Sequence, residues 1–429
     1  MSGSATLERR LANYRTVLAG RPRPAHAALR HAGMAPATLL AEAVGGEVVT
    51  APEGSYVRVE AAGHDVTIDR TRLARLPGMP PAEVPLVCLD TETTGLSTGA
   101  GTLAFLVGLG SWADGRFRQV QYLLPDEADE PALLDAIGRQ IPANAWLVTY
   151  NGRSFDWPLL VARFRQGRRE APAHEGHLDL LPVVRRLFRH RMENARLKTV
   201  ETTLLGIHRH EDVEGWEIPG RYLGFLRGGP AGPLVQIVEH NDEDVRSLAR
   251  VLGLLDSAYG DPVARAAAPS GDLAGLARSF LQHGRLTEAL ECLETAVARP
   301  VGARPRFVLH WDDHGVRLER SGVPSVDRDR IASTHARLLR RLGRHQEAAA
   351  AWLAIAEREG QLSVRSHIEV AKIREHVDRD HRGALEAALN ADRLLARARP
   401  GRAREPLRRD LDRRLRRLRL RLRAGAIPT

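Results

Sequence analysis

Apolar and polar residues follow strand-like and helix-like patterns in turn between residues 84 and 259. Short apolar runs predict buried strands, whereas apolar residues spaced three and four apart predict helices. The tripeptide ADG at 113–115 separates two apolar runs and predicts a hairpin turn. Strands are expected at 84–90, 102–112, 116–124 and 145–151, and helices at 129–141, 156–166, 179–191, 197–206 and 236–259. Three antiparallel strands, a helix, a fourth strand and further helices predict an α/β fold with a mixed sheet.

After residue 266 the pattern becomes almost wholly helical and repeats itself. The segment 283–299 aligns with 342–358, and a looser copy covers 382–396. The shared small and apolar positions resemble tetratricopeptide helix pairs, whose period is roughly 34 residues. The first two copies lie further apart than this because a predicted hairpin, near 306–322, stands between them. We therefore expect an all-α, tetratricopeptide-like helical-repeat domain.

Both ends of the chain differ from its middle. A helix-like stretch covers 7–18, and alternating residues around the turn APEGS at 51–55 predict a β-hairpin. Four segments are therefore expected: an N-terminal arm with a short helix and a β-hairpin (1–80), the α/β domain (81–260), the helical repeats with the hairpin insert (270–396) and an arginine-rich amphipathic C-terminal helix (397–429).

The C-terminal segment combines a leucine stripe with dense positive charge. Leucines recur every three or four residues from Leu407 to Leu422, which predicts one apolar helix face. One interpretation is a capping helix that docks its leucines on the repeats. The other is an arm that binds nucleic-acid backbone, because so much like charge is costly unless it is neutralised.

The net charge of +10 is a property of this tail. Residues 397–429 contain 13 arginines and three acidic residues, so the rest of the chain is neutral. The two cysteines, Cys88 and Cys292, exclude a disulfide framework and a four-cysteine zinc site. No apolar run approaches the roughly 20 residues that span a bilayer. We expect a cytoplasmic protein without a membrane segment.

Two carboxylates end the first apolar strand. Asp90 and Glu92 lie two residues apart in CLDTETTG, so both side chains leave the same face of a strand. Carboxylates held together repel each other unless a proton or a cation joins them. Magnesium and manganese prefer such oxygen ligands. The pair therefore indicates a divalent-metal site.

Two later motifs carry further acidic residues. In YNGRSFDWPLL, a strand ends near Asn151 and Asp156 begins a helix, where it suits either capping or metal binding. In VEHNDEDV, His240 and Asp244 lie one helical turn apart. Either they pair structurally, or Asp244 binds metal and His240 orients or deprotonates a water.

The order D-x-E, N-x-x-x-F-D and H-x-x-x-D resembles the four-carboxylate (DEDD) exonuclease superfamily, which has a ribonuclease H-like fold. Within that superfamily the chain is most similar to YprB-type ribonuclease H-like domains. Further matching segments are HLDLLPVVRRLFR at 177–189, LKTVETTLLG at 197–206 and DVEGWEIPGRYLGFLRGG at 212–229. The resemblance covers about 84–258.

The resemblance implies a role for each motif residue. Asp90 would bridge two divalent ions, Mg²⁺ or Mn²⁺. Glu92 and Asp244 would hold one ion, Asp156 would support the other through water, and His240 would position the nucleophilic water. Contacts with nucleic acid are implied for Thr93, Gly95, Leu96 and Asn151.

The spacing of the last motif leaves open whether His240 or another residue positions the nucleophilic water. The four-residue separation of His240 and Asp244 is that of the tyrosine-bearing branch, and it is shorter than in histidine-bearing members. An alternative helper is His177 or its neighbour Asp179, whose other interpretation is packing and helix capping.

These observations predict a metal-dependent 3′–5′ exonuclease that acts on DNA or RNA by a two-metal-ion mechanism. The alternative is a non-catalytic adaptor that binds nucleic acid and recruits a protein partner through its helical repeats. No membrane partner is expected.

Overall fold

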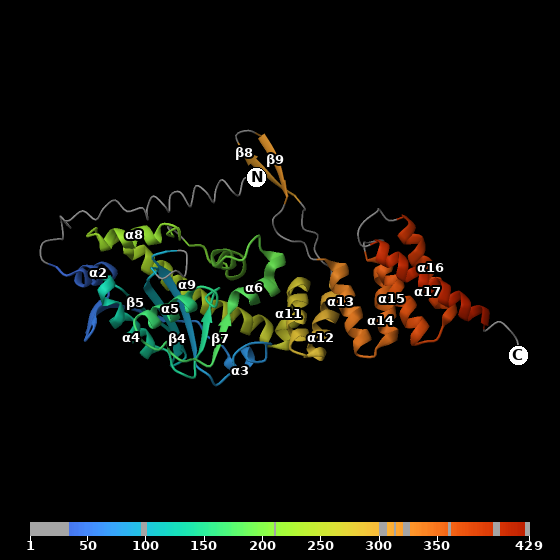
Figure 1. Ribbon diagram of the computed structural model, residues 1–429, viewed down its shortest axis with the longest axis horizontal. Coiled ribbons are helices and arrows are strands. Elements are labelled where there is room, and N and C mark those ends of the chain that lie inside the picture. The colour runs from blue at the N-terminus through green and yellow to red at the C-terminus, as the bar shows by residue number, and fades with distance from the viewer. Residues whose placement is uncertain are drawn as a thin grey trace. The chain divides into compact units, whose positions relative to one another are not determined.

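A computed structural model describes residues 34–95, 101–209, 212–299, 307–312, 315–320, 327–358, 362–397 and 404–424 of the chain. The chain divides into two compact units (Figure 1). The first comprises Met1–Val184 and Ala195–Asp261, and the second comprises Arg185–Asn194 and Pro262–Thr429. No helix in the described ranges is long and apolar enough to cross a membrane.

Within the described part of the first unit, seven strands form one mixed sheet in the order β1-β2-β5-β4-β3-β6-β7. The strands are β1 (Glu47–Ala51), β2 (Gly54–His64), β3 (Leu86–Thr93), β4 (Ala104–Ala113), β5 (Arg116–Leu123), β6 (Trp146–Thr149) and β7 (Gly176–Asp179). Neighbours are antiparallel from β1 to β3, whereas β3–β6 and β6–β7 are parallel. The mixed sheet with flanking helices confirms the predicted fold class.

The β4–β5 hairpin forms where the ADG turn was predicted. Ala113 pairs with Arg116, and Asp114 and Gly115 between them have φ of 52° and 76°. Two residues with positive φ make a type I′ turn, whose twist matches that of the flanking strands. The turn therefore sets the register of the two central strands.

One strand was not predicted. β7 is only four residues long and ends at the residue where a helix was predicted to begin. β1 and β2 form the predicted hairpin, and β2 joins the central sheet through antiparallel pairs with β5, such as Val59 with Gln121. The predicted helix at 7–18 lies outside the described residues.

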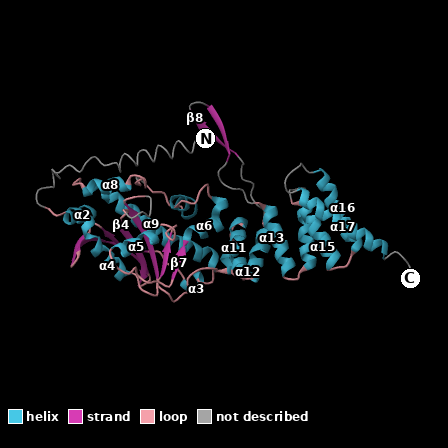
Figure 2. Ribbon diagram, viewed as in Figure 1, coloured by secondary structure: helices cyan, strands magenta, loops and turns pink. Residues whose placement is uncertain are grey.

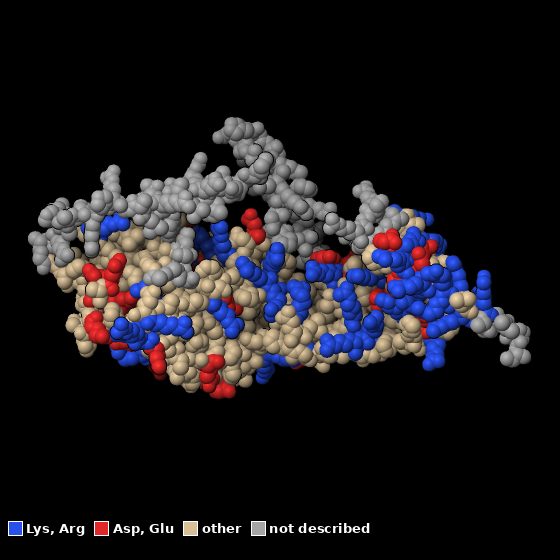
Figure 3. All heavy atoms as spheres, in the orientation of Figure 1, with Lys and Arg blue, Asp and Glu red and all other residues tan. Residues whose placement is uncertain are grey.

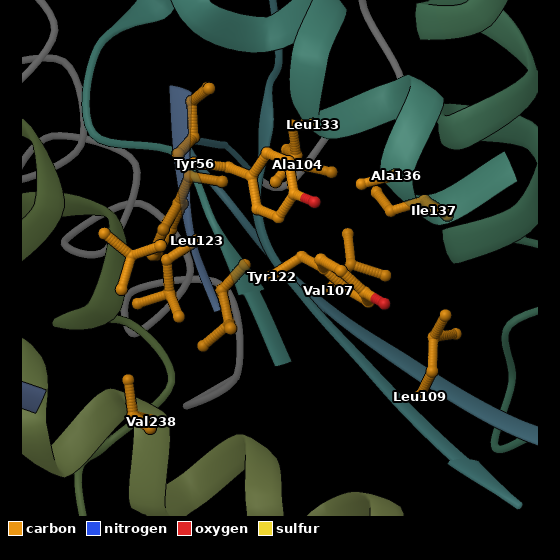
Figure 4. Packing of buried hydrophobic residues seen from close by; sticks show 14 of the residues in the cluster. Tyr56, Ala104, Val107, Leu109, Tyr122, Leu123, Leu133, Ala136, Ile137 and Val238 are labelled. Atoms are coloured by element: carbon orange, nitrogen blue, oxygen red, sulfur yellow. The ribbon is translucent and has the colours of Figure 1, made fainter. Parts of the chain in front are cut away.

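Helices α2, α4, α8 and α9 pack on this sheet. The described helices before residue 261 are α2 (Pro36–Val44), α3 (Arg70–Leu73), α4 (Glu130–Gln140), α5 (Asp156–Gln166), α6 (Leu180–Phe188), α7 (Leu197–Val200), α8 (Ile218–Leu226) and α9 (Val235–Leu255). Figure 4 shows strand side chains such as Val107 and Tyr122 between α4 and α9. Phe105 on β4 stacks on Tyr222 of α8, with ring centroids 3.9 Å apart. This core fixes α9 against the sheet.

The second unit is helical apart from one hairpin, as the colours of Figure 2 show. Its elements are α10 (Pro262–Ala266), α11 (Ser270–Gln282), α12 (Leu286–Ala298), β8 (Phe307–Asp312), β9 (Gly315–Arg320), α13 (Arg328–Arg341), α14 (His345–Ala356), α15 (Ser363–His376), α16 (His381–Arg397) and α17 (Arg404–Ala424). Consecutive helices from α11 to α17 pack against each other. Gly284 and Gly343 have φ of 73° and 78° at equivalent turns, a conformation that suits glycine.

The C-terminal helix α17 docks on this unit by its leucines. Leu411, Leu415 and Leu418 are buried. Glu375 of α15 is fully buried and accepts hydrogen bonds from Arg414 and Arg417 of α17. The leucine stripe is thus used for packing, while arginines on the other face stay exposed.

Candidate active site

The predicted acidic residues lie at one edge of the sheet, where the parallel strands β3 and β6 end. Asp90 and Glu92 are on the last part of β3, and Asp156 is the first residue of α5, which follows β6. Asp244 lies on α9, which packs across β3, β4 and β5. The carboxyl edge of parallel strands is where open α/β sheets commonly bind ligands.

The four carboxylates act on each other electrostatically. Burial raises the pKa of Asp90 well above its usual range, and the charges of Asp244, Asp156 and Glu92 raise it further. Burial also raises the pKa of Glu92, with Asp244 and Asp156 adding to the shift. Like charges have this effect at short range in a poorly solvated site. Hydrogen bonds join the three sequence motifs as well, because Asn241 of α9 donates to Asp90 and Thr91 of β3 donates to Asp156.

Asp156 is held from β3. Thr91 Oγ1 donates a hydrogen bond of 2.5 Å to Asp156 Oδ1. Burial raises the pKa of Asp156, and the Thr91 hydrogen bond opposes that shift. Because Thr91 stands between Asp90 and Glu92 in β3, it links the helix that carries the third carboxylate to the strand that carries the first two.

A buried amide network orients Asp90. Asn241 Nδ2 donates to Asp90 Oδ2 at 2.9 Å, and Gln121 Nε2 donates to Asn241 Oδ1 at 2.9 Å. A Cβ at Gly108 would lie 2.2 Å from Asn241 Oδ1, so only glycine lets α9 approach β4 this closely. The network fixes the amide of Asn241 with its donor toward the carboxylate.

His240 faces the carboxylates with one ring nitrogen and Asp212 with the other. Its Nε2 lies 3.8 Å from Glu92 Oε1 and 3.7 Å from Asp244 Oδ2, whereas Nδ1 lies 2.6 Å from Asp212 Oδ1. Burial would raise the pKa of Asp212, but the hydrogen bond and charge of His240 lower it. A carboxylate only accepts hydrogen bonds, so this short contact assigns a proton to Nδ1.

Arg209 places a guanidinium among these acids. It forms a double hydrogen bond with the fully buried Glu201, and Nη2 also donates to Asp244 Oδ1. Its Nη1 lies 3.3 Å from His240 Nδ1. Burial lowers the pKa of Arg209, but the charges of Asp244 and Glu201 outweigh burial and raise it. Glu201 opens a π-helical turn (Glu201–Leu205), a distortion often found at functional sites.

Three of the four residues expected to contact nucleic acid, Thr93, Gly95 and Asn151, lie around this edge. Thr93 Oγ1 donates to the Gly95 carbonyl oxygen at 2.7 Å. Asn151 has φ of 68° in the turn after β6, and its backbone N–H donates to Asp179 Oδ1 at 2.8 Å. Leu96 lies outside the described residues.

The two alternative helpers have structural partners. Asp179 Oδ1 also accepts the N–H of Leu181, which caps the start of α6. His177 Nε2 lies 2.9 Å from Thr149 Oγ1, and burial lowers the pKa of His177 to about 4. Packing and capping account for these contacts.

The donor set suits a divalent cation. Asp90, Glu92, Asp156 and Asp244 supply hard oxygen ligands. Burial raises the pKa of Asp90, Glu92 and Asp156, and the charges of neighbouring carboxylates raise the pKa of Asp90 and Glu92 further. In the described part of the chain, no three acidic, histidine or cysteine side chains are already arranged around a common metal position. The carboxylates instead contact the protein donors Asn241, Thr91 and Arg209. The residues fit Mg²⁺ or Mn²⁺ chemically.

Sequence reasoning did not find the supporting residues Gln121, Asn241, Asp212, Arg209 and Glu201. A signal existed for the first two, because a glutamine in an apolar strand and an asparagine on the apolar face of a helix each need a buried partner. Loop residues such as Asp212 carry no comparable signal.

The class of domain follows from comparison with known families. The RNase_H superfamily matches residues 87–255, which run from β3 to the end of α9 and include all four carboxylates. The family supports a nuclease-type activity on nucleic acid.

A match to one relative covers more of the chain. The chain is 30% identical over 308 residues to "Uncharacterized protein YprB" of Bacillus subtilis (strain 168), which is 71% of this chain and 68% of that protein. The chain therefore belongs to the YprB family and carries a ribonuclease H superfamily domain.

Proposed function

We propose that the protein is a metal-dependent nuclease, specifically a 3′–5′ exonuclease that hydrolyses phosphodiester bonds of DNA or RNA. The observation that carries the proposal is the approach of α9 to the carboxylates of β3: His240 Nε2 lies 3.8 Å from Glu92 Oε1 and 3.7 Å from Asp244 Oδ2, and Asn241 donates to Asp90 at 2.9 Å. Membership of the RNase_H superfamily supports the nuclease class.

Asp90, Glu92, Asp156 and Asp244 would hold two divalent cations, Mg²⁺ or Mn²⁺. When bound, such ions activate water and stabilise the leaving oxygen in phosphodiester cleavage. The protein supplies the charge and the rigidity of the ligand set. Asn241 and Thr91 fix two of the carboxylates from opposite sides, through hydrogen bonds of 2.9 Å and 2.5 Å.

His240 would position the water that attacks phosphorus and accept its proton at Nε2. This nitrogen faces Glu92 and Asp244, at 3.8 Å and 3.7 Å, so it is directed toward the carboxylate cluster. Asp212 holds the opposite nitrogen and selects the tautomer that leaves Nε2 free to accept. Asp212 is thus a positioning residue.

The second unit would be a tetratricopeptide-like array that engages a nucleic-acid or protein partner. Its support is the succession of packed helical hairpins with left-handed glycines at equivalent turns. The buried leucines of α17 support the capping role of the tail.

Oligonucleotides labelled at the 3′ or 5′ end test the activity. Purified protein with Mg²⁺ or Mn²⁺ is expected to release labelled mononucleotides from the 3′ end first. Asp90→Ala and Asp244→Ala should abolish release, while Asp114→Asn, in an exposed hairpin turn whose positive φ asparagine tolerates, should retain it. Inactivity of the wild-type protein with both metals, or full activity of the two site variants, would refute the proposal.

The adaptor remains the second candidate, and one observation favours it. Arg209 donates a hydrogen bond to Asp244. A guanidinium in this position could take the place of a metal ion in a site that binds nucleic acid without cutting it. An adaptor would bind oligonucleotides with equal affinity in EDTA and in Mn²⁺ and would leave them intact. The same labelled strands therefore distinguish the two candidates.

A further inference from the structure

A groove with a volume of about 660 Å³ lies within the second unit. Helices α13, α14, α15 and α17 line it. The lining residues are Arg337, Arg340, Arg341, Trp352, Arg365, Ile368, Glu369, Lys372, Leu407 and Asp410. Trp352, Ile368 and Leu407 supply its apolar surface, and the remaining lining residues are all charged.

Positive charge exceeds negative charge in this groove. Glu369 is shared by Arg340, at 2.6 Å, and Lys372, at 2.7 Å. Arg337, Arg341 and Arg365 form no ion pair with a carboxylate of the described residues. The groove therefore presents three guanidinium groups whose charge the described part of the protein leaves unbalanced.

The arrangement of these groups follows from helix geometry. Arg337 and Arg341 lie one turn apart on α13, about 6 Å along the helix axis. Arg365 and Lys372 lie two turns apart on one face of α15. Positive groups thus run along both α13 and α15, which suits an extended anion better than a single small one.

Positive charge continues beyond the groove. Arg409, Arg413, Arg416 and Arg419 are exposed on α17. Figure 3 shows lysine and arginine side chains gathered over the helices of this unit, with fewer acidic ones between them. An anion long enough to leave the groove would therefore still meet arginine.

We propose that this groove binds the phosphodiester backbone of a nucleic-acid strand. The choice of ligand rests on the proposed function, and the site is separate from the carboxylate cluster of the first unit. Guanidinium groups bind phosphate oxygens through paired hydrogen bonds, and a nucleic-acid strand offers a phosphate at every nucleotide. Because these contacts go to the backbone, binding is independent of base sequence.

Replacing the three arginines tests the groove. The full-length variant Arg337→Gln/Arg341→Gln/Arg365→Gln is compared with Arg328→Gln/Arg382→Gln/Arg397→Gln, which removes the same charge from exposed positions outside the groove. Fluorescence anisotropy with a labelled 30-nucleotide single strand is measured in EDTA at several salt concentrations, so that no cleavage occurs. Circular dichroism checks that both variants fold.

The groove variant should bind about tenfold or more weakly, and its salt slope should fall by about 2, since each phosphate contact contributes about 0.7 for single strands. The control variant should change much less. Equal losses in both variants, or an unchanged groove variant, would overturn the proposal. So would a groove that binds polyglutamate while strand binding is unaffected, because the partner would then be an acidic protein segment.

This outcome is separable from that of the proposed function. Binding in EDTA does not depend on cleavage. If the protein binds strands through the groove but never cuts them, the proposed nuclease function is refuted and the proposed groove function stands. If it cuts short strands and the groove does not contribute to binding, the nuclease function stands and the groove proposal is refuted.

Discussion

Replacing Arg209 with methionine removes the buried cation of the carboxylate cluster while keeping a side chain of similar length. The side chain of Glu201 is fully buried, and that of Arg209 is 7% exposed. A double hydrogen bond joins the two side chains, and one of its arms is 2.8 Å long. In the variant, Glu201 keeps its burial and loses its partner.

The expected loss of stability is large. Removing one partner of a buried ion pair costs about 3–5 kcal/mol because the other charge stays buried and unpaired. For a unit of this size, each kcal/mol lowers the melting temperature by about 2–4 °C, so the shift should be about 6–20 °C. A variant that removes both charges, Glu201→Gln/Arg209→Met, should recover most of that loss.

Calorimetric melting in EDTA measures these shifts for the single and double variants. Arg118→Met serves as the control, since Arg118 pairs with Asp114 at the surface and its loss should leave the melting temperature unchanged. A single variant that melts within about 2 °C of the wild-type protein would refute the reasoning, because substitutions of ordinary surface residues lower the melting temperature by a similar amount. A double variant that is no more stable than the single one would refute it as well.

Three further predictions concern the same cluster. Asp212→Asn should lower kcat about 10- to 100-fold with little change in KM, as is typical when a positioning partner is lost; an unchanged kcat would exclude the positioning role. Asn241→Ala leaves buried polar groups unpaired and should cost about 1–3 kcal/mol in urea unfolding, and a smaller loss would contradict the network. Burial and like charge raise the pKa of Asp90 and Glu92, so the folded metal-free protein holds protons that the unfolded chain releases. The contribution of these two groups to the free energy of unfolding should therefore be fully present below the ordinary carboxyl pKa and be lost as pH rises through the raised pKa values. Asp90→Asn should make this loss with pH less steep, and a steeper loss in that variant would contradict the prediction.

Much of the sheet could be predicted because its patterns are local. The apolar runs and the Asp114–Gly115 turn specify the β4–β5 hairpin without reference to the rest of the chain. The helix predicted at 156–166 has the bounds of α5. In contrast, β7 spans four residues, too few to show a period, and the pairing of β2 with β5 joins residues far apart in sequence.

The carboxylates of the site could be proposed from sequence because their spacing repeats a known order of motifs. Their supporting contacts could not. Arg209 reaches Asp244 across 35 positions, and Asp212 reaches His240 from a loop across 28. Such pairs depend on where α9 packs on the sheet, and no local sequence pattern predicts that position. The buried amides of Gln121 and Asn241 were visible in the sequence as polar residues in apolar patterns, but their partners were not.

The central claim is that acidic side chains from β3, α5 and α9 together hold divalent cations. Titration of Mn²⁺ into the metal-free protein, followed by calorimetry, tests it directly. The wild-type protein is expected to bind two ions, and Asp90→Asn/Asp244→Asn to bind none at the same concentrations. Equal binding by the wild-type protein and the double variant, or no binding by either, would contradict the claim.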